Sequence, residues 1–126
     1  MRIEHAALWT ADLERSRAFY EAYFGGSAGM RYVNPRTGFA SYFLTFDGGA
    51  RLELMQRPDV AGGDSTERIG WAHVAFSVGS REAVDALTER LRADGYTVVS
   101  GPRTTGDGYY ESVVLDPDGA RVEIMV

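Results

Sequence analysis

The sequence contains an internal repeat. Residues 49–55 read GARLELM and residues 119–125 read GARVEIM, so the two segments align at an offset of 70 residues with two conservative differences. Upstream, HAALWTAD at 5–12 aligns with HVAFSVGS at 73–80 at an offset of 68 residues. A period this long that occurs only twice is typical of a duplicated supersecondary unit, because solenoid repeats are shorter and more numerous.

Both halves predict the same order of elements, which is a strand, a helix and three further strands. In the first half, a strand over Ile3–Trp9 precedes a helix that Asp12 caps and that runs to a glycine pair. In the second half, a strand over Trp71–Val78 precedes a helix that Ser80 caps. The further strands are expected near 28–33, 39–46 and 51–57, and near 96–100, 109–115 and 121–126.

This order predicts an α+β fold made of two βαβββ modules, each a curved mixed sheet with one helix. We place the modules at about 1–57 and 71–126, with a polar, glycine-rich linker over 58–70. The length of 126 residues fits one domain, so we expect a single domain over 1–126 in which two cupped sheets surround a metal site.

Four side chains at equivalent positions of the repeat predict that metal site. The chain has two histidines, His5 and His73, and they align with each other, as do Glu53 and Glu123. In a strand, alternate side chains point to opposite faces, so each glutamate, flanked by apolar residues, lies on the face away from the helix. The histidines are expected on that same face of the first strands.

Two imidazoles and two carboxylates are a suitable ligand set for one divalent ion such as Ni, Zn, Co, Mn or Fe. Taken singly, each residue is more often a surface group than a ligand, and it is the matching repeat positions that favour the metal site. Four other acidic residues lack a counterpart and are assigned to surface or capping roles. They are Glu4, Asp12, Glu67 and Glu111.

Composition excludes several other classes of function. The formal net charge is -5 and no basic cluster stands out, which argues against nucleic acid or an anionic membrane surface as a partner. The absence of cysteine excludes thiolate metal sites and disulfides. The sequence shows no long apolar run and no signal peptide, so we expect a cytoplasmic protein whose partner is a small-molecule substrate.

The segments DLERSRAFYEAYFG, ARLELM, WAHVAFSV and VVLDPDGARVEIMV resemble the vicinal oxygen chelate superfamily over nearly the whole chain. The resemblance implies that two vicinal substrate oxygens bind a metal that stabilises an enediolate. Glyoxalase I of this superfamily uses four protein ligands, whose positions match His5, Glu53, His73 and Glu123. The implied function is therefore a divalent-metal-dependent, glyoxalase I-like lyase or isomerase of a small 2-oxo or 2-hydroxycarbonyl compound, with a hemithioacetal as one candidate. Glu123 and Glu53 are its implied catalytic residues.

Other members of the superfamily supply the alternatives. They are an antibiotic-modifying enzyme of the fosfomycin type, an acyl-thioester epimerase, and a drug-binding resistance protein without catalysis. The chain also departs from bacterial glyoxalase I at Trp9 and Arg57, where that family has an arginine and an asparagine that help to hold glutathione. The departures predict another thiol carrier or a substrate without a thiol. Relatives of this kind usually form homodimers with the metal between subunits, so a homodimer is the expected assembly.

Overall fold

The computed structural model describes residues 3–60, 71–106 and 108–126 of the chain. It divides into two compact units, Met1–Gly63 and Asp64–Val126, and each is described here by itself. The boundary falls within the predicted linker, most of which lies outside the described residues. Each unit corresponds to one half of the sequence repeat.

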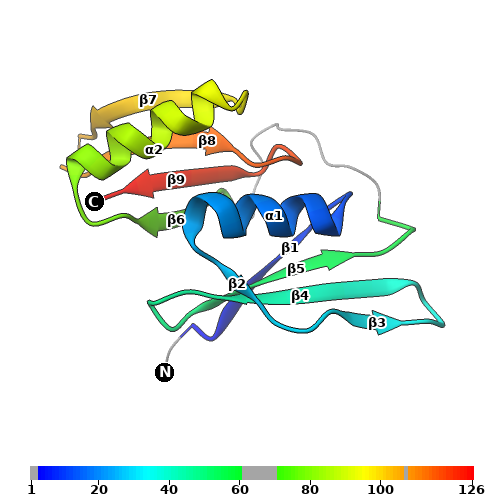
Figure 1. Ribbon diagram of the computed structural model, residues 1–126. Helices are drawn as coiled ribbons and strands as arrows, with labels where there is room; N and C mark the ends of the chain where they lie inside the picture. The colour runs from blue at the N-terminus through cyan, green and yellow to red at the C-terminus, as the bar shows by residue number, and fades with distance from the viewer. Residues whose placement is uncertain (1–2, 61–70, 107) are drawn as a thin grey trace. The chain divides into compact units, whose positions relative to one another are not determined.

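The first unit is a mixed sheet with one helix on it (Figure 1). The strand order is β1-β5-β4-β2, and β3 also pairs with β4. The pairing of β1 with β5 is parallel, whereas the other pairings are antiparallel. Its elements are β1 (His5–Trp9), α1 (Leu13–Phe24), β2 (Ser27–Ala28), β3 (Tyr32–Asn34), β4 (Phe39–Thr45) and β5 (Arg51–Gln56).

One strand expected in this unit is divided in two. The prediction of a single strand near 28–33 was wrong, because β2 and β3 pair with different parts of β4. Gly29 still donates its backbone N–H to the Phe43 carbonyl at 2.9 Å, and the strand is interrupted at Met30, which is 95% exposed.

Helix α1 begins and ends where its capping residues predict. The Asp12 side chain accepts a hydrogen bond from the backbone N–H of Arg15 at 3.0 Å. Gly25 follows the last residue with a φ of 68°, a left-handed conformation that glycine adopts without a steric penalty. The helix buries Leu13, Phe19 and Tyr20. These side chains form the core of the first unit together with the buried residues of the sheet, which are Ala40, Tyr42, Leu44, Leu52 and Leu54.

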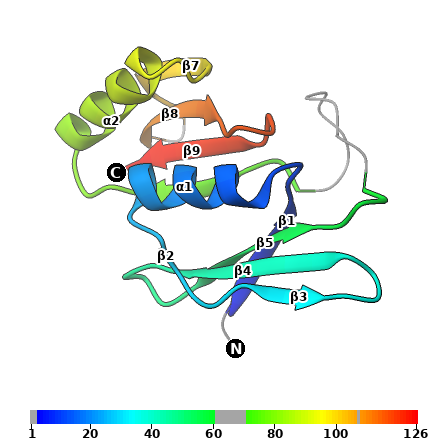
Figure 2. The ribbon, with the colours of Figure 1, turned by 45° about the vertical axis from the view of Figure 1, so that its right-hand side comes forward.

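The second unit repeats this plan (Figure 2). The strand order is β6-β9-β8-β7, with β6 parallel to β9 and the other pairs antiparallel. Its elements are β6 (Val74–Ser77), α2 (Arg81–Ala93), β7 (Val98–Thr104), β8 (Tyr110–Leu115) and β9 (Arg121–Met125). The two units together confirm the predicted α+β fold of two βαβββ modules.

Two strands of the second unit differ from their predicted bounds. Strand β6 is shorter than the predicted Trp71–Val78, and His73 lies one residue before it. Strand β7 extends to Thr104 because two register irregularities let it continue along β8. The core consists of Val84 and Leu91 from α2 packed with Val114, Val122 and Ile124 of the sheet, all with no exposed surface.

Each unit also buries a pair of hydroxyl groups. The Thr10 and Ser16 hydroxyl oxygens lie 2.6 Å apart in the first unit, and those of Thr88 and Ser112 lie 2.6 Å apart in the second. Thr88 also donates to the backbone carbonyl of Val84, at 2.6 Å. These buried polar atoms therefore have the partners that their desolvation requires.

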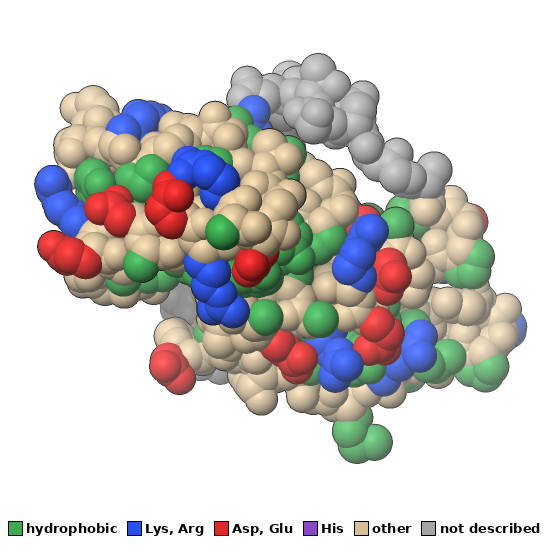
Figure 3. Space-filling model, turned by 45° about the horizontal axis from the view of Figure 1, so that its top comes forward, with side chains coloured by type: hydrophobic (Ala, Val, Ile, Leu, Met, Phe, Trp, Pro, Cys, Tyr) green, Lys and Arg blue, Asp and Glu red, His purple; other side chains and the backbone are tan. Residues whose placement is uncertain are grey.

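The charged side chains do not separate by sign. On the face shown in Figure 3, arginine and carboxylate side chains are interspersed. Neither of the two described helices is both long and apolar enough to cross a lipid bilayer.

Candidate metal centre

The parallel pair β1 and β5 places His5 and Glu53 on one face of the first sheet. Strand register pairs Ala7 with Glu53 and Leu8 with Leu54, and Leu54 is fully buried. Leu54 in turn pairs with Tyr42, whose hydroxyl donates to Glu14 of α1 at 2.9 Å, so this is the face that the helix covers. By alternation, Glu53 points to the other face, where His5 also lies.

In this unit, Nε2 of His5 lies 3.9 Å from Oε2 of Glu53. The imidazole side chain is 40% exposed and the carboxylate is 15% exposed. The His5 ring also meets the Phe43 ring edge to face, with centroids 5.2 Å apart. The two polar groups therefore lie beside the Phe43 ring on the face of the sheet that the helix does not cover.

The second unit reproduces this pair. Strand register joins Ala75 to Glu123, as it joins Ala7 to Glu53 in the first unit. Nε2 of His73 lies 3.1 Å from Oε2 of Glu123, and the two side chains are 41% and 17% exposed. The duplicated backbone thus places the same two residue types in the same relation twice.

The donor set fits a divalent ion in chemistry. Imidazole nitrogen and carboxylate oxygen are both good ligands for borderline transition metals, and two carboxylates balance the charge of a dication. Within the described residues, no group of three or more histidine or acidic side chains lies close enough to hold a metal. Each unit therefore holds one histidine–glutamate pair. That the two pairs bind one metal ion together remains a prediction.

Glu4 has a role beyond the surface or capping role assigned to it from the sequence. Its carboxylate Oε2 lies 2.5 Å from Nδ1 of His5, and its Oε1 accepts from Nε of Arg51 at 2.7 Å. The hydrogen bond to His5, followed by the nearby Arg51 guanidinium, holds the pKa of Glu4 below its ordinary value despite partial desolvation. Its position next to one of two histidines was the signal in the sequence, but the Arg51 contact depends on strand register.

Glu111 was also assigned to a surface or capping role from the sequence, but its side chain is largely buried. Its side chain is 13% exposed and lies 3.6 Å from the Arg103 guanidinium. It pairs with Met125, two positions along β8 from the partner of Glu123, and so shares the helix-free face of the second sheet. Of the other two acidic residues, Asp12 caps α1 as expected, and Glu67 lies outside the described residues.

The positions that depart from glyoxalase I meet at the other end of β1 and β5. The Arg57 guanidinium lies 5.3 Å from the centre of the Trp9 ring, a cation–π distance. Arg57 also forms an ion pair with Asp59, at 2.5 Å, which lowers the pKa of the Asp59 carboxyl. An arginine and an indole therefore lie together at the two positions where the sequence differs from the pattern of glyoxalase I.

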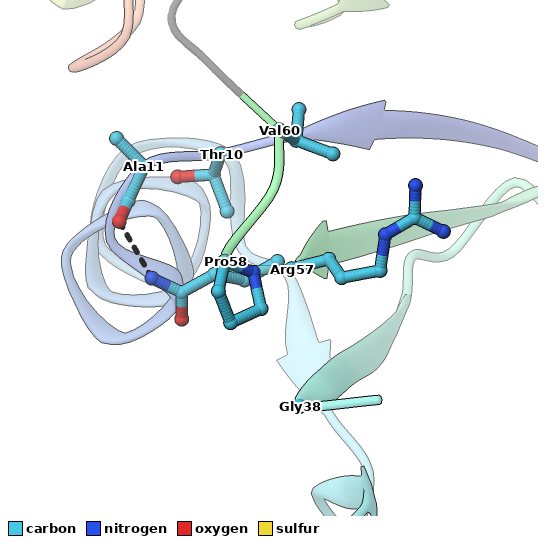
Figure 4. A pocket seen from close by; sticks show the side chains of 7 residues that line it. Thr10, Ala11, Gly38, Arg57, Pro58 and Val60 are labelled. Atoms are coloured by element: carbon cyan, nitrogen blue, oxygen red, sulfur yellow. Dashed lines mark hydrogen bonds between the residues drawn. The ribbon is translucent and has the colours of Figure 1, made fainter. Parts of the chain in front are cut away.

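A pocket of about 470 Å³ opens beside Arg57 (Figure 4). Gln56 closes one side of it by donating from Nε2 to the backbone carbonyl of Ala11 at 2.6 Å. His5 and Glu53 do not line it. The lining residues are Thr10, Ala11, Gly38, Gln56, Arg57, Pro58 and Val60.

Relatives of known sequence match the chain over its length. The uncharacterised protein YqjT of Bacillus subtilis (strain 168) is 30% identical over 135 residues, which cover 98% of this chain and 97% of YqjT. The lactoylglutathione lyase of Salmonella typhimurium (strain LT2) is 32% identical over 130 residues, covering 99% of this chain and 92% of the lyase.

Solved structures match the fold. Glyoxalase I from Zea mays superposes with a TM-score of 0.82 at 24% identity, covering 98% of this chain and 44% of the maize chain. This chain therefore spans less than half the length of the maize protein. The sequence model of the Glyoxalase/Bleomycin resistance protein/Dioxygenase superfamily matches residues 2–124. With the repeated modules and these relatives, that match shows that the chain belongs to this superfamily.

Proposed function

We propose that the chain is a divalent-metal-dependent, glyoxalase I-like lyase or isomerase that acts on a small 2-oxo or 2-hydroxycarbonyl compound. His5 and Glu53 would hold the ion from one module, and His73 and Glu123 from another. The observation that carries the proposal is the recurrence of one histidine–glutamate pair in both units, with nearly equal exposure of the matching side chains. Similarity to lactoylglutathione lyases supports the reaction class.

When bound, the metal would act as a Lewis acid that stabilises negative charge on a substrate oxygen. A side chain of the protein would carry out the proton transfer. We assign Glu123 as the base that accepts a proton from substrate carbon and returns it to the neighbouring carbon. Its carboxylate is 17% exposed, so few water molecules compete with substrate for its oxygens. Nε2 of His73 lies 3.1 Å from that carboxylate, within reach of a hydrogen bond that would orient it.

Glu53 is the second catalytic candidate. Its carboxylate stands on the equivalent strand of the other module and is 15% exposed. In a site shared by the two modules, Glu53 would serve the opposite face of a planar substrate and would take the part of Glu123 for a substrate bound in the opposite sense. Glu53 also separates this proposal from three-ligand enzymes of the fosfomycin type, which lack a glutamate at that position.

The substrate carrier is proposed to differ from glutathione. Trp9 and Arg57 occupy the two departing positions, and their contact presents an aromatic face with a positive charge held over it. Such a pair favours a flat group on the substrate, since the Arg57 charge is already paired with Asp59. A thiol carrier other than glutathione, or a substrate without any thiol, fits these side chains.

The test begins with metal. The protein, stripped with chelator and dialysed against Ni, Zn, Co or Mn, should retain one ion per site by elemental analysis, and His5→Ala and His73→Ala should each lose it. Activity is then screened with hemithioacetals of several thiols and with free 2-oxoaldehydes. A protein that retains no stoichiometric metal from any of these baths would refute the proposal and favour a drug-binding role.

A further inference from the structure

Glu4 joins two side chains at the start of the β1–β5 pairing. The backbone carbonyl of Glu4 accepts from the N–H of Arg51 at 2.9 Å, which anchors the two strands at this point. The carboxylate then lies between His5 Nδ1, at 2.5 Å, and the Arg51 guanidinium, whose Nη2 is 2.6 Å away. The Arg51 guanidinium lies in turn 4.2 Å from the centre of the Phe43 ring.

The residues in these contacts surround the His5 ring. Phe43 meets the imidazole edge to face at 5.2 Å, so the aromatic ring that holds Arg51 also borders His5. Glu4, which lies just before β1, and Phe43 of β4 therefore restrain the imidazole from two sides. The exposed position of His5, at 40%, would otherwise leave its ring free to rotate.

The contact with Glu4 also favours one of the two positions of the proton on a neutral imidazole. A carboxylate oxygen accepts hydrogen bonds, so the contact at 2.5 Å favours the form of neutral His5 that carries its proton on Nδ1. Its lone pair then lies on Nε2, the nitrogen that faces Glu53. Histidines that bind metals commonly donate their other ring N–H to a carboxylate, which orients the ring and raises its basicity.

We propose that Glu4 is a positioning residue that holds His5 in the Nδ1–H form, so that Nε2 is the nitrogen that binds metal. The inference rests on the proposed function, since it assigns a task to Glu4 in the same site. It also makes the two modules unequal. The position that aligns with Glu4 in the second half is Ala72, whose methyl side chain has no oxygen to offer His73.

The experiment compares Glu4→Gln and Glu4→Ala with the unchanged protein. The first readout is the ¹⁵N spectrum of the two ring nitrogens of His5 in metal-free protein, at alkaline pH where imidazole is neutral. We expect the Nδ1–H form in the unchanged protein and a mixture of both forms in Glu4→Ala. The second readout is Zn²⁺ affinity by competition with a chelating dye, which we expect Glu4→Ala to lower by about 10- to 100-fold.

The control is Glu89→Gln, which removes a carboxylate that also pairs with an arginine, Arg92, on the exposed face of α2. It should leave the His5 spectrum and the Zn²⁺ affinity unchanged. The proposal is overturned if Glu4→Ala keeps the Nδ1–H form, or keeps Zn²⁺ affinity within twofold. If the unchanged protein binds none of Ni, Zn, Co and Mn, the proposed function fails, while the metal-free spectrum still decides whether Glu4 orients His5. Glu4→Gln serves if Glu4→Ala does not fold.

Discussion

Nε2 of His73 lies 3.1 Å from Oε2 of Glu123, and the same two atoms of His5 and Glu53 are 3.9 Å apart. In both pairs the imidazole is more exposed than the carboxylate, at 41% against 17% and at 40% against 15%. The agreement extends to strand register, since each glutamate is opposite an alanine on the parallel strand. The two modules therefore preserve one local geometry although their sequences have diverged elsewhere.

The substitution Glu123→Gln should reduce activity far more than metal affinity. The amide oxygen still coordinates an ion, but the amide cannot accept a proton from carbon. We expect turnover to fall by about 10²- to 10⁴-fold, the usual contribution of a general base, with metal content retained. Turnover with the preferred substrate and elemental analysis of the same sample measure the two effects. Near-normal turnover would show that another group is the base, and Glu53→Gln is the matched comparison.

The protein should be a homodimer with two metal sites. Each sheet has its helix on one face only, so the face with the histidine–glutamate pair must be covered by another module. A twofold arrangement uses the same surface on both chains and closes without further growth. Light scattering with metal bound should give about twice the 13.8 kDa mass of one chain. A mass of one chain at micromolar concentration would contradict the prediction.

Tyr42 should make folding stability sensitive to alkaline pH. Burial, followed by the hydrogen bond to Glu14, raises the pKa of the Tyr42 hydroxyl above its ordinary value of 10.0. The folded state thus favours the neutral phenol, and this contribution is fully present below the unfolded pKa of about 10. It is lost as pH rises through the higher folded value.

The variant Tyr42→Phe cannot ionise at this position, so its stability should fall less steeply above about pH 10. At neutral pH it should be less stable by about 1 kcal/mol, because the hydrogen bond to Glu14 is lost. Urea unfolding across this range measures both effects. Tyr109→Phe, at a tyrosine that is 53% exposed, is the control. An unchanged alkaline slope in Tyr42→Phe would exclude Tyr42 as the source.

Removing the Thr88 hydroxyl should destabilise the second unit more than removing its partner. Thr88 donates to the Val84 carbonyl, so the Ser112 hydroxyl donates to Thr88. Thr88→Val leaves the buried Ser112 hydroxyl without a hydrogen-bond acceptor, which should lower the free energy of unfolding by about 1–3 kcal/mol. Ser112→Ala leaves Thr88 bonded to the Val84 carbonyl. The double variant should cost less than the sum, as urea unfolding of all three can show. Equal single effects would contradict this account.

Local patterns predicted most of the fold. Alternation in Leu52, Glu53 and Leu54 determined which face of β5 is buried, and the structure has Leu52 and Leu54 buried with Glu53 opposite. Both helix starts followed from their capping side chains, Asp12 and Ser80. These features depend on neighbours within a few residues, so the sequence contains all the information they need.

The remaining features depend on pairing between distant segments. The Glu4–Arg51 contact requires that His5 be opposite Arg51, and that register joins residues far apart in the chain. The burial of Glu111 likewise follows from its place between β7 and β9. No local pattern distinguishes such a glutamate from a solvated one, and both acidic residues were assigned to surface or capping roles because they lack a counterpart in the repeat.

The strand order has a consequence for how the chain folds. Strands β4 and β5 form a local hairpin, whereas β1 pairs with β5 across the intervening helix and three strands. Closing the longer loop costs more chain entropy, so β1 should dock late, and β6 likewise in the second unit. Contacts formed after the transition state change the unfolding rate and leave the folding rate almost unaltered. An ion held by His5 and His73 would therefore slow unfolding and leave the folding rate almost unaltered. It would stay bound for as long as the edge strands β1 and β6 remain paired.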